Sequence, residues 1–181
     1  MGAVMEKDIE RILLTTSDID AKVKSLGAEL TKDYADKNPI LLGLLKGSVM
    51  FMADLMKHLD MPIEIEFMDV SSYHGVESTG QIKILKDLDT SVKDRHVIIA
   101  EDIVDTGRTL EYVIELLKLR GAKSVEMVTL LYKKEARLAP IEAKYIGFSI
   151  PKAFVVGYGL DYNEKYRNLP YIGILKQSVY E

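Results

Sequence analysis

Three segments of the chain repeat apolar residues every three or four positions, which is the spacing of a buried helix face. They lie within residues 6–34, 49–59 and 110–121. The first helix follows a short start, and Ser17 or Asp18 can cap it. The residues expected on the buried faces are Ile19, Val23, Leu26 and Leu30, then Val49, Met52, Ala53 and Met56, then Leu110, Val113, Ile114 and Leu117.

Short apolar or alternating runs lie between these helices and predict strands. They occupy residues 40–45, 63–73, 81–88, 97–100, 125–134, 145–150, 153–160 and 171–175. Since strands and helices alternate in the middle of the chain, we expect one α/β domain with a mainly parallel sheet. The runs 63–73 and 81–88 are expected to form a ribbon around residues 74–81, a small, polar segment with two glycines that is typical of a mobile loop.

Composition limits the class of protein. With 181 residues, 48% hydrophobic content and no apolar stretch near the ~20 residues that cross a bilayer, we expect a globular domain without a membrane partner. The lack of cysteine excludes disulfides, thiolate metal sites and a cysteine nucleophile, and it fits the cytoplasm. A net charge of −4 gives no general attraction to nucleic acid, and the first residues lack a signal-peptide pattern.

Acidic residues end the buried run 97–100 and precede a turn. Glu101, Asp102 and Asp105 follow the run, and Thr106-Gly107-Arg108-Thr109 leads into the third helix. Free backbone N–H groups at such a helix start suit a phosphate, although the same residues would also suit a helix capped by its own threonine and aspartate side chains. Neither a Walker A pattern nor a strand-linked G-x-G-x-x-G is present, which disfavours a P-loop nucleotidase.

The two adjacent acids require a compensating partner. Because successive strand residues point to opposite faces, at least one of Glu101 and Asp102 is expected to be enclosed. An enclosed carboxylate is costly without a cation or a hydrogen-bond donor. A sugar phosphate fits both halves of the segment, since its hydroxyls donate to carboxylates, its phosphate accepts from the turn, and Mg²⁺ can join the two.

The segment AEDIVDTGRT, residues 100–109, resembles the phosphoribosyl-diphosphate (PRPP) binding motif of type I phosphoribosyltransferases, in the version of the hypoxanthine phosphoribosyltransferases. Further segments resemble that family in the same order: LLKGSVMF, SSYHGVESTG, LLYKK and FVVGYGLDYNEKYRNLPYIG. The resemblance implies the type I fold, a mainly parallel sheet flanked by helices with a small hood. It divides the single domain 1–181 into a core of about 37–158 and a hood from about 1–36 and 159–181.

The resemblance also implies roles for individual residues. Glu101 and Asp102 would hold the ribose hydroxyls, directly or through Mg²⁺, with Asp161 near a second ion, and Asp105 would accept the proton of purine N7. The PRPP site would comprise Glu101, Asp102, Asp105, Thr106, Gly107, Arg108 and Thr109, with Lys46, Gly47 and Arg167 at the diphosphate. Lys46-Gly47 is similar to the loop of that family whose backbone contacts diphosphate, often through an uncommon cis peptide.

For the base, the resemblance implies that Lys133 donates to the 6-oxo group, Phe154 stacks on the purine and Val155 meets its edge, with Asp161 nearby. Ser72 and Tyr73 would belong to a loop that closes over the reacting centre. Without the resemblance, Lys46, Asp161 and Arg167 would pass as surface charges, and Phe154 and Val155 as core residues of a strand.

The resemblance implies transfer of 5-phosphoribosyl from PRPP to hypoxanthine, and also guanine, by a cytoplasmic homodimer or homotetramer that uses Mg²⁺. Alternatives within the class are a xanthine-preferring transferase or a pyrimidine transferase. Lys133 and Phe154 favour a 6-oxopurine over a pyrimidine, and the preference among hypoxanthine, guanine and xanthine stays open. Outside it, a non-catalytic PRPP or nucleotide sensor would keep the phosphate loop. A signalling domain phosphorylated on aspartate would place a lone aspartate away from such a loop.

Overall fold

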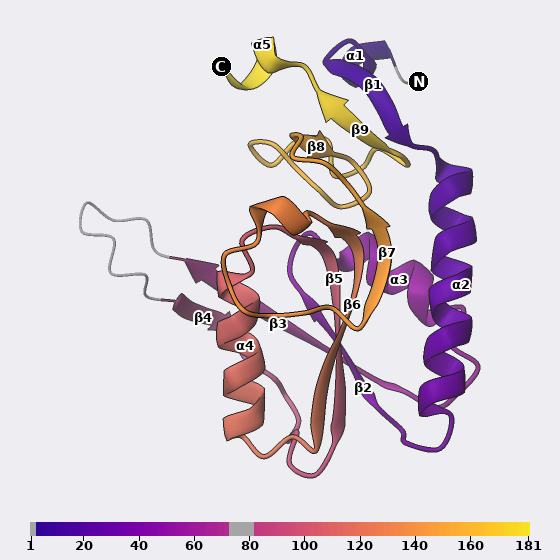
Figure 1. Ribbon diagram of the computed structural model, residues 1–181, viewed down its shortest axis with the longest axis vertical. Helices are drawn as coiled ribbons and strands as arrows, with labels where there is room; N and C mark the ends of the chain where they lie inside the picture. Colours follow the sequence, from indigo (N-terminus) through magenta and orange to yellow (C-terminus); the bar gives the residue numbers. More distant parts are fainter. Residues whose placement is uncertain (1–2, 73–81) are drawn as a thin grey trace.

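The computed structural model describes residues 3–72 and 82–181, and most of them surround a central six-stranded sheet (Figure 1). The strand order is β4-β3-β2-β5-β6-β7. Neighbours from β3 to β7 run parallel, and β4 pairs antiparallel with β3. The bounds are β2 Ile40–Leu44, β3 Glu64–Ser72, β4 Ile82–Lys86, β5 His96–Val104, β6 Ser124–Tyr132 and β7 Tyr145–Ser149. The expected mainly parallel α/β sheet is therefore confirmed.

A smaller antiparallel sheet joins the two ends of the chain and forms the hood. It has the order β1-β9-β8, with β1 Ile9–Leu14, β8 Val155–Val156 and β9 Ile172–Leu175. Short helices α1, Ala3–Glu6, and α5, Gln177–Tyr180, flank it. Figure 1 shows α1 and α5 at the same end of the molecule, above the central sheet. The predicted small hood is thus present as a separate sheet.

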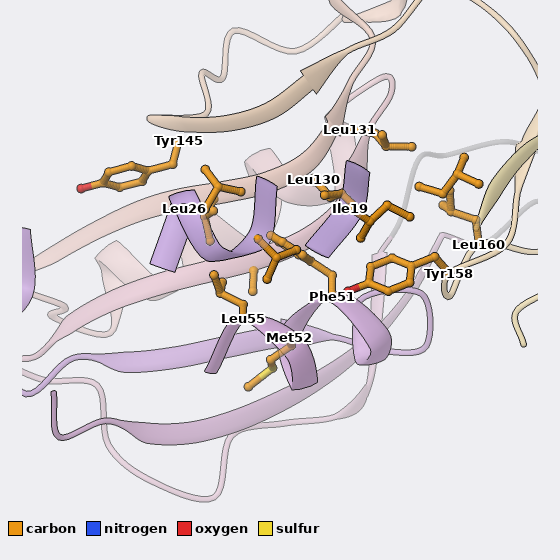
Figure 2. Packing of buried hydrophobic residues seen from close by; sticks show 14 of the residues in the cluster. Ile19, Leu26, Phe51, Met52, Leu55, Leu130, Leu131, Tyr145, Tyr158 and Leu160 are labelled. Carbon is orange, nitrogen blue, oxygen red and sulfur yellow. The ribbon is translucent and has the colours of Figure 1, made fainter. Parts of the chain in front are cut away.

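Helices cover the central sheet on both faces. Helix α2, Thr16–Tyr34, and helix α3, Val49–Met56, bury apolar side chains with one face, and helix α4, Arg108–Leu119, packs on the other. Consecutive residues of β5 divide between the faces: Ile98 packs with α2 and α3, whereas Ile99 packs with α4. Figure 2 shows part of the first cluster, with Ile19 and Leu26 of α2 lying next to Phe51 and Leu55 of α3. A strand buried on both faces reads as a continuous apolar run, as the sequence indicated.

The start of the chain differs from the prediction. Residues 9–14 form β1 rather than part of a helix, because they pair with β9 at the far end of the chain. Helix α2 is capped by Thr15, not by Ser17 or Asp18. Thr15 Oγ1 accepts from the Asp18 backbone N–H, and the Asp18 carboxylate accepts from the Thr15 N–H, which is a capping box.

The buried face of α3 was predicted correctly only at Met52, and the predicted Ala53 is half-buried. Phe51, Met52 and Leu55 are buried, whereas Val49 and Met56 are exposed. The helix presents two apolar faces and only one meets the sheet, so apolar spacing alone does not identify it. The face predicted for α4 is correct at Leu110, Val113 and Leu117, with Ile114 half-buried.

Two strands have lengths that the sequence did not indicate. The apolar run 97–100 is the middle of a longer strand that continues through both acids to Val104. Within 153–160 only Val155 and Val156 form a strand, and they pair with β9 of the hood. The predicted boundaries between core and hood stay a prediction. Helix α2 packs on the central sheet, and β8 belongs to the hood sheet.

None of the helices in the described part of the chain is both long and apolar enough to cross a membrane.

Phe51 is fully buried between α3 and the sheet and gives a measurable test of this packing. We expect Phe51→Ala to lower the free energy of unfolding by about 3–5 kcal/mol, the range for truncating a buried aromatic residue. Leu119→Ala, at a position that is 86% exposed, is the matched control and should change it by less than about 0.5 kcal/mol. Urea denaturation measures both, and equal losses would contradict the packing described here.

Candidate active site

The candidate site lies where β5, the central strand, ends between β2 and β6. Asp102 is buried, and its Oδ1 accepts from the Ile103 backbone N–H at 2.8 Å. Gly47 lies directly against the Asp102 carboxylate, and a Cβ at that position would overlap it. Glu101 Oε2 is buried and has no hydrogen-bond partner within the described protein. The expected enclosure of the acids thus applies to both carboxylates.

Burial and mutual proximity raise the pKa of both acids. Desolvation is the first cause of the rise in the pKa of Glu101 well above its usual range, and the neighbouring Asp102 carboxylate adds to it. Desolvation also raises the pKa of Asp102 to about 6, opposed by hydrogen bonds and by the charge of Arg167. Two acids that share one enclosed place do not both ionise readily, so the site favours a cation or donors that compensate them.

The turn after β5 leaves the start of α4 open. Gly107 is the N-cap residue, with φ of 79°, and no side chain caps the helix there. The capping alternative for the threonine and aspartate residues is therefore not what the structure shows. The Thr106 carbonyl instead accepts from the backbone N–H groups of Leu138 and Ala139, which fixes the turn from behind. A cavity of about 170 Å³ lies here, lined by Glu101, Ile103, Asp105, Thr106, Gly107, Thr109 and Leu110.

A second cavity, of about 380 Å³, adjoins the first and shares Glu101, Ile103, Thr109 and Leu110 with it. The rest of its lining comes from the end of β2 and the loop after it, from β3 and β5, and from the segment after β8. These residues are Leu44, Leu45, Lys46, Gly47, Val70, Asp102, Leu160, Asp161 and Arg167. The structure thus places most of the predicted PRPP residues on one continuous hollow. Arg108 is the exception, since its side chain is exposed and lines neither cavity.

The loop after β2 and the segment after β8 meet beside Asp102. The cis peptide joins Leu45 to Lys46, one bond before the Lys46-Gly47 pair. The backbone of Gly159 lies against the Gly47 carbonyl so closely that a Cβ there would overlap it. Arg167 Nη1 donates to the Gly159 carbonyl at 2.8 Å, and Arg167 Nη2 pairs with Asp161 at 3.0 Å.

Lys133 and Asp105 lie together at the turn after β5. The Lys133 ammonium is 3.1 Å from Asp105 Oδ2, and the lysine side chain is 11% exposed whereas that of Asp105 is 49% exposed. The carboxylate is therefore accessible while its cationic partner is held in place. This arrangement presents a donor and an acceptor side by side, which suits a planar ring with adjacent acceptor and donor atoms.

Phe154 and Val155 do not line either of these cavities. Val155 is buried in the hood sheet, and Phe154 is 38% exposed. Tyr180 stacks on the Phe154 ring, with centroids 4.8 Å apart, and Tyr162 meets its edge at 5.5 Å. The predicted loop residue Ser72 ends β3, and its side chain, Tyr73 and the predicted mobile loop lie outside the described residues.

Comparison with known proteins shows the family. The Phosphoribosyl transferase domain model matches residues 12–163, and the hypoxanthine-guanine phosphoribosyltransferase of Bacillus subtilis is 56% identical over 98% of this chain and 99% of its own. The chain belongs to the type I phosphoribosyltransferase family. The Streptococcus pyogenes hypoxanthine-guanine phosphoribosyltransferase is 55% identical over the same shares of the two chains.

Solved structures agree with this family assignment. A hypoxanthine phosphoribosyltransferase crystal structure from Staphylococcus aureus superposes with a TM-score of 0.96, 56% identity and coverage of 100% of this chain and 99% of that one. The Trypanosoma cruzi hypoxanthine phosphoribosyltransferase in complex with the product IMP gives 0.90 at 42% identity, covering 96% and 98% of the two chains. Membership of the phosphoribosyltransferases sets aside the phosphorylated signalling domain considered from sequence.

Sequence reasoning about this phosphoribosyltransferase missed the residues that support its site. Glu164 contacts Lys46 and Arg167, and Tyr162 and Tyr180 contact Phe154. Each comes from the last 20 residues or so, where no periodic pattern indicates a partner. Only the positions of Tyr162 and Glu164 inside the family-like segment could have drawn attention to them.

The raised pKa values predict how stability depends on pH. Between about pH 4 and 6, without ligand, the folded state holds protons on Glu101 and Asp102 that the unfolded state has lost. These two groups therefore lower the free energy of unfolding as pH rises through that window. The double variant Glu101→Gln/Asp102→Asn should lack this contribution and gain on the order of 2 kcal/mol relative to wild type from about pH 4 to 6.

Urea denaturation in the presence of a chelator, at a series of pH values, measures this difference. The control is the double variant Glu29→Gln/Asp36→Asn at exposed positions, which should follow wild type. If the site variant and wild type keep a constant difference across the window, the two carboxyls are not held protonated as described.

Proposed function

We propose that this phosphoribosyltransferase transfers the 5-phosphoribosyl group of PRPP to hypoxanthine and to guanine, giving IMP or GMP and diphosphate in purine salvage. The observation that carries the proposal is the continuous hollow that joins the buried acid pair, the open start of α4 and the cationic loop after β2. The identity of 55–56% to hypoxanthine-guanine phosphoribosyltransferases over nearly the full length supports it.

The hollow has the donors and acceptors that PRPP requires. The 5′-phosphate would accept from the backbone N–H groups and hydroxyls of residues 105–109 at the start of α4, where the helix dipole is positive. The ribose hydroxyls would donate to Glu101 and Asp102, and the diphosphate would lie at Lys46, Gly47 and Arg167. Arg108 would contribute its backbone to the turn, since its side chain is exposed.

The Lys133–Asp105 pair supports a 6-oxopurine as the acceptor. In hypoxanthine the 6-oxo oxygen is an acceptor and N7 can carry a proton, and the two atoms are neighbours on one edge. Lys133 would donate to the oxygen while Asp105 accepts the N7 proton, so that N9 becomes the nucleophile. Adenine presents a 6-amino donor to Lys133, which disfavours it. Phe154 would stack on the ring and the Val155 backbone would meet its edge.

The acid pair fits Mg²⁺ as the cofactor. Glu101 Oε2 is buried without a partner, and carboxylate oxygens are the ligands that Mg²⁺ prefers. Among the residues that the structure describes, no three acidic, histidine or cysteine side chains gather closely enough to hold a metal alone. Glu101, Asp102 and Asp161 would hold Mg²⁺ together with ligand oxygens, and the bound ion would supply neutralisation of the departing diphosphate.

Three further features stay proposals. Ser72 and Tyr73 would belong to a loop that excludes water from the ribosyl centre. A cytoplasmic location is expected from the composition. A homodimer or homotetramer is supported by the exposed apolar side chains of Val49 and Met50 on α3, and a monomeric mass in solution would contradict it.

A substrate panel tests the proposed function. Initial rates are measured with PRPP and each of hypoxanthine, guanine, xanthine, adenine and uracil, with Mg²⁺ present or chelated. We expect turnover with hypoxanthine and guanine that depends on Mg²⁺ and little with adenine or uracil. Binding of PRPP without turnover of any base would favour the non-catalytic sensor. A preference for xanthine would instead show a xanthine-preferring phosphoribosyltransferase.

Asp105→Asn tests the proposed proton acceptor. The variant keeps the size of the side chain but cannot accept the N7 proton as a base, so we expect kcat with hypoxanthine to fall by ~10²–10⁴. Steady-state kinetics measures the loss, and Asp36→Asn, at an exposed position after α2, should keep wild-type rates. Normal turnover in Asp105→Asn would remove Asp105 from the mechanism.

A further inference from the structure

Glu164 lies between the two cations that the proposed function assigns to diphosphate. Its Oε2 is 3.1 Å from the Lys46 ammonium, and Arg167 Nη2 is 3.4 Å from both of its carboxylate oxygens. Lys46 comes from the loop after β2. Arg167 comes from the segment that leads to β9, 121 positions later in the sequence. A single carboxylate thus joins two positive groups from distant parts of the chain.

The backbone presents Glu164 to these cations through a fixed turn. Asn163 and Glu164 have φ of 51° and 59°, in the left-handed region. The Glu164 N–H donates to Asp161 Oδ2 at 2.9 Å, and the backbone groups of Tyr162 and Lys165 pair across the turn. Left-handed backbone at two consecutive non-glycine residues is uncommon and persists only where surrounding contacts hold it. The turn therefore holds the Glu164 carboxylate next to the two cations.

We propose that Glu164 is an internal anion that occupies the place of the diphosphate group between Lys46 and Arg167, so that PRPP and product diphosphate must displace it. This inference rests on the proposed function. It makes Glu164 a residue that weakens diphosphate binding and thereby assists release of the product. The ligand's phosphoryl oxygens, with more than one negative charge, replace one carboxylate.

The exposure of the pair makes such an exchange feasible. The side chains of Lys46 and Glu164 are 63% and 64% exposed, and exposed ion pairs contribute little to stability. Lys46 and Arg167 lower the pKa of Glu164, which keeps the carboxylate ionised at neutral pH. The contact is strong enough to place the charge and weak enough to be broken by a competing anion.

A positioning role for Glu164 is the competing explanation, in which it orients Arg167 for the ligand. Arg167 has two other anchors, the Gly159 carbonyl at 2.8 Å and Asp161 at 3.0 Å, both shorter than its contacts with Glu164. The guanidinium therefore stays oriented when the Glu164 carboxylate is neutralised. Competition with the ligand remains as the main effect of the negative charge.

The test is Glu164→Gln, with Glu29→Gln on α2 as a control that removes the same charge at an exposed, distant position. Calorimetric titration with diphosphate in Mg²⁺ buffer should give a Kd about three- to tenfold lower for Glu164→Gln than for wild type. KM for PRPP should fall by a similar factor while KM for hypoxanthine stays within about twofold. The gain should shrink as NaCl rises, because salt screens exposed charges.

Unchanged or weaker diphosphate binding by Glu164→Gln, in a protein whose wild type binds diphosphate and turns over hypoxanthine, would overturn the inference alone. A wild type that neither binds diphosphate nor turns over would instead refute the proposed function. If the glutamine variant does not fold, Glu164→Asn carries the same test, because asparagine tolerates left-handed backbone. A matching gain in Glu29→Gln would also overturn the inference, since it would show a general charge effect.

Discussion

The enclosure of two adjacent carboxylates at the end of the central strand is the constraint on which the site depends. The backbone of the loop after β2 lies against the Asp102 carboxylate, Glu101 Oε2 is buried beside it, and desolvation raises the pKa of both acids. Apolar residues at these two positions would pack without the free-energy cost of burying carboxylates. The arrangement therefore makes the ligand-free site less stable and favours binding of a ligand that brings hydrogen-bond donors and positive charge. The two acids thus lower the stability of the ligand-free protein and favour ligand binding.

The neighbouring elements follow from that constraint. Gly47 has no room for a side chain because the Asp102 carboxylate lies against it. Gly159 has no room for one because the Gly47 carbonyl lies against it. The segment that begins at Gly159 then brings Asp161 and Arg167 to the same hollow, and Glu164 contacts Arg167 there, so this segment adds charges to those of the central sheet. Core and hood are thus joined through the site as well as through the packing of α2.

Sequence reasoning succeeded where a local pattern has a local cause. Apolar periodicity located α2 and α4 and the buried strands, and the motif at residues 100–109 located the turn at the start of α4. It failed where a distant partner decides the outcome. Residues 9–14 became a strand because β9 offers an edge, and α3 buried Phe51 rather than Val49 because the sheet lies on that side.

The amino-acid sequence by itself indicated the alternation of strands and helices in the middle of the chain, the family and the residue types of the site, because spacing, turn chemistry and a contiguous motif are properties of neighbours along the chain. Tertiary structure decided which of those residues meet. Lys46 and Glu164 pair across 118 positions, and Phe154 stacks on Tyr180 near the chain's end. Such contacts form only when the sheet order and the hood bring separate segments together. The spacing of apolar residues along the chain does not predict them.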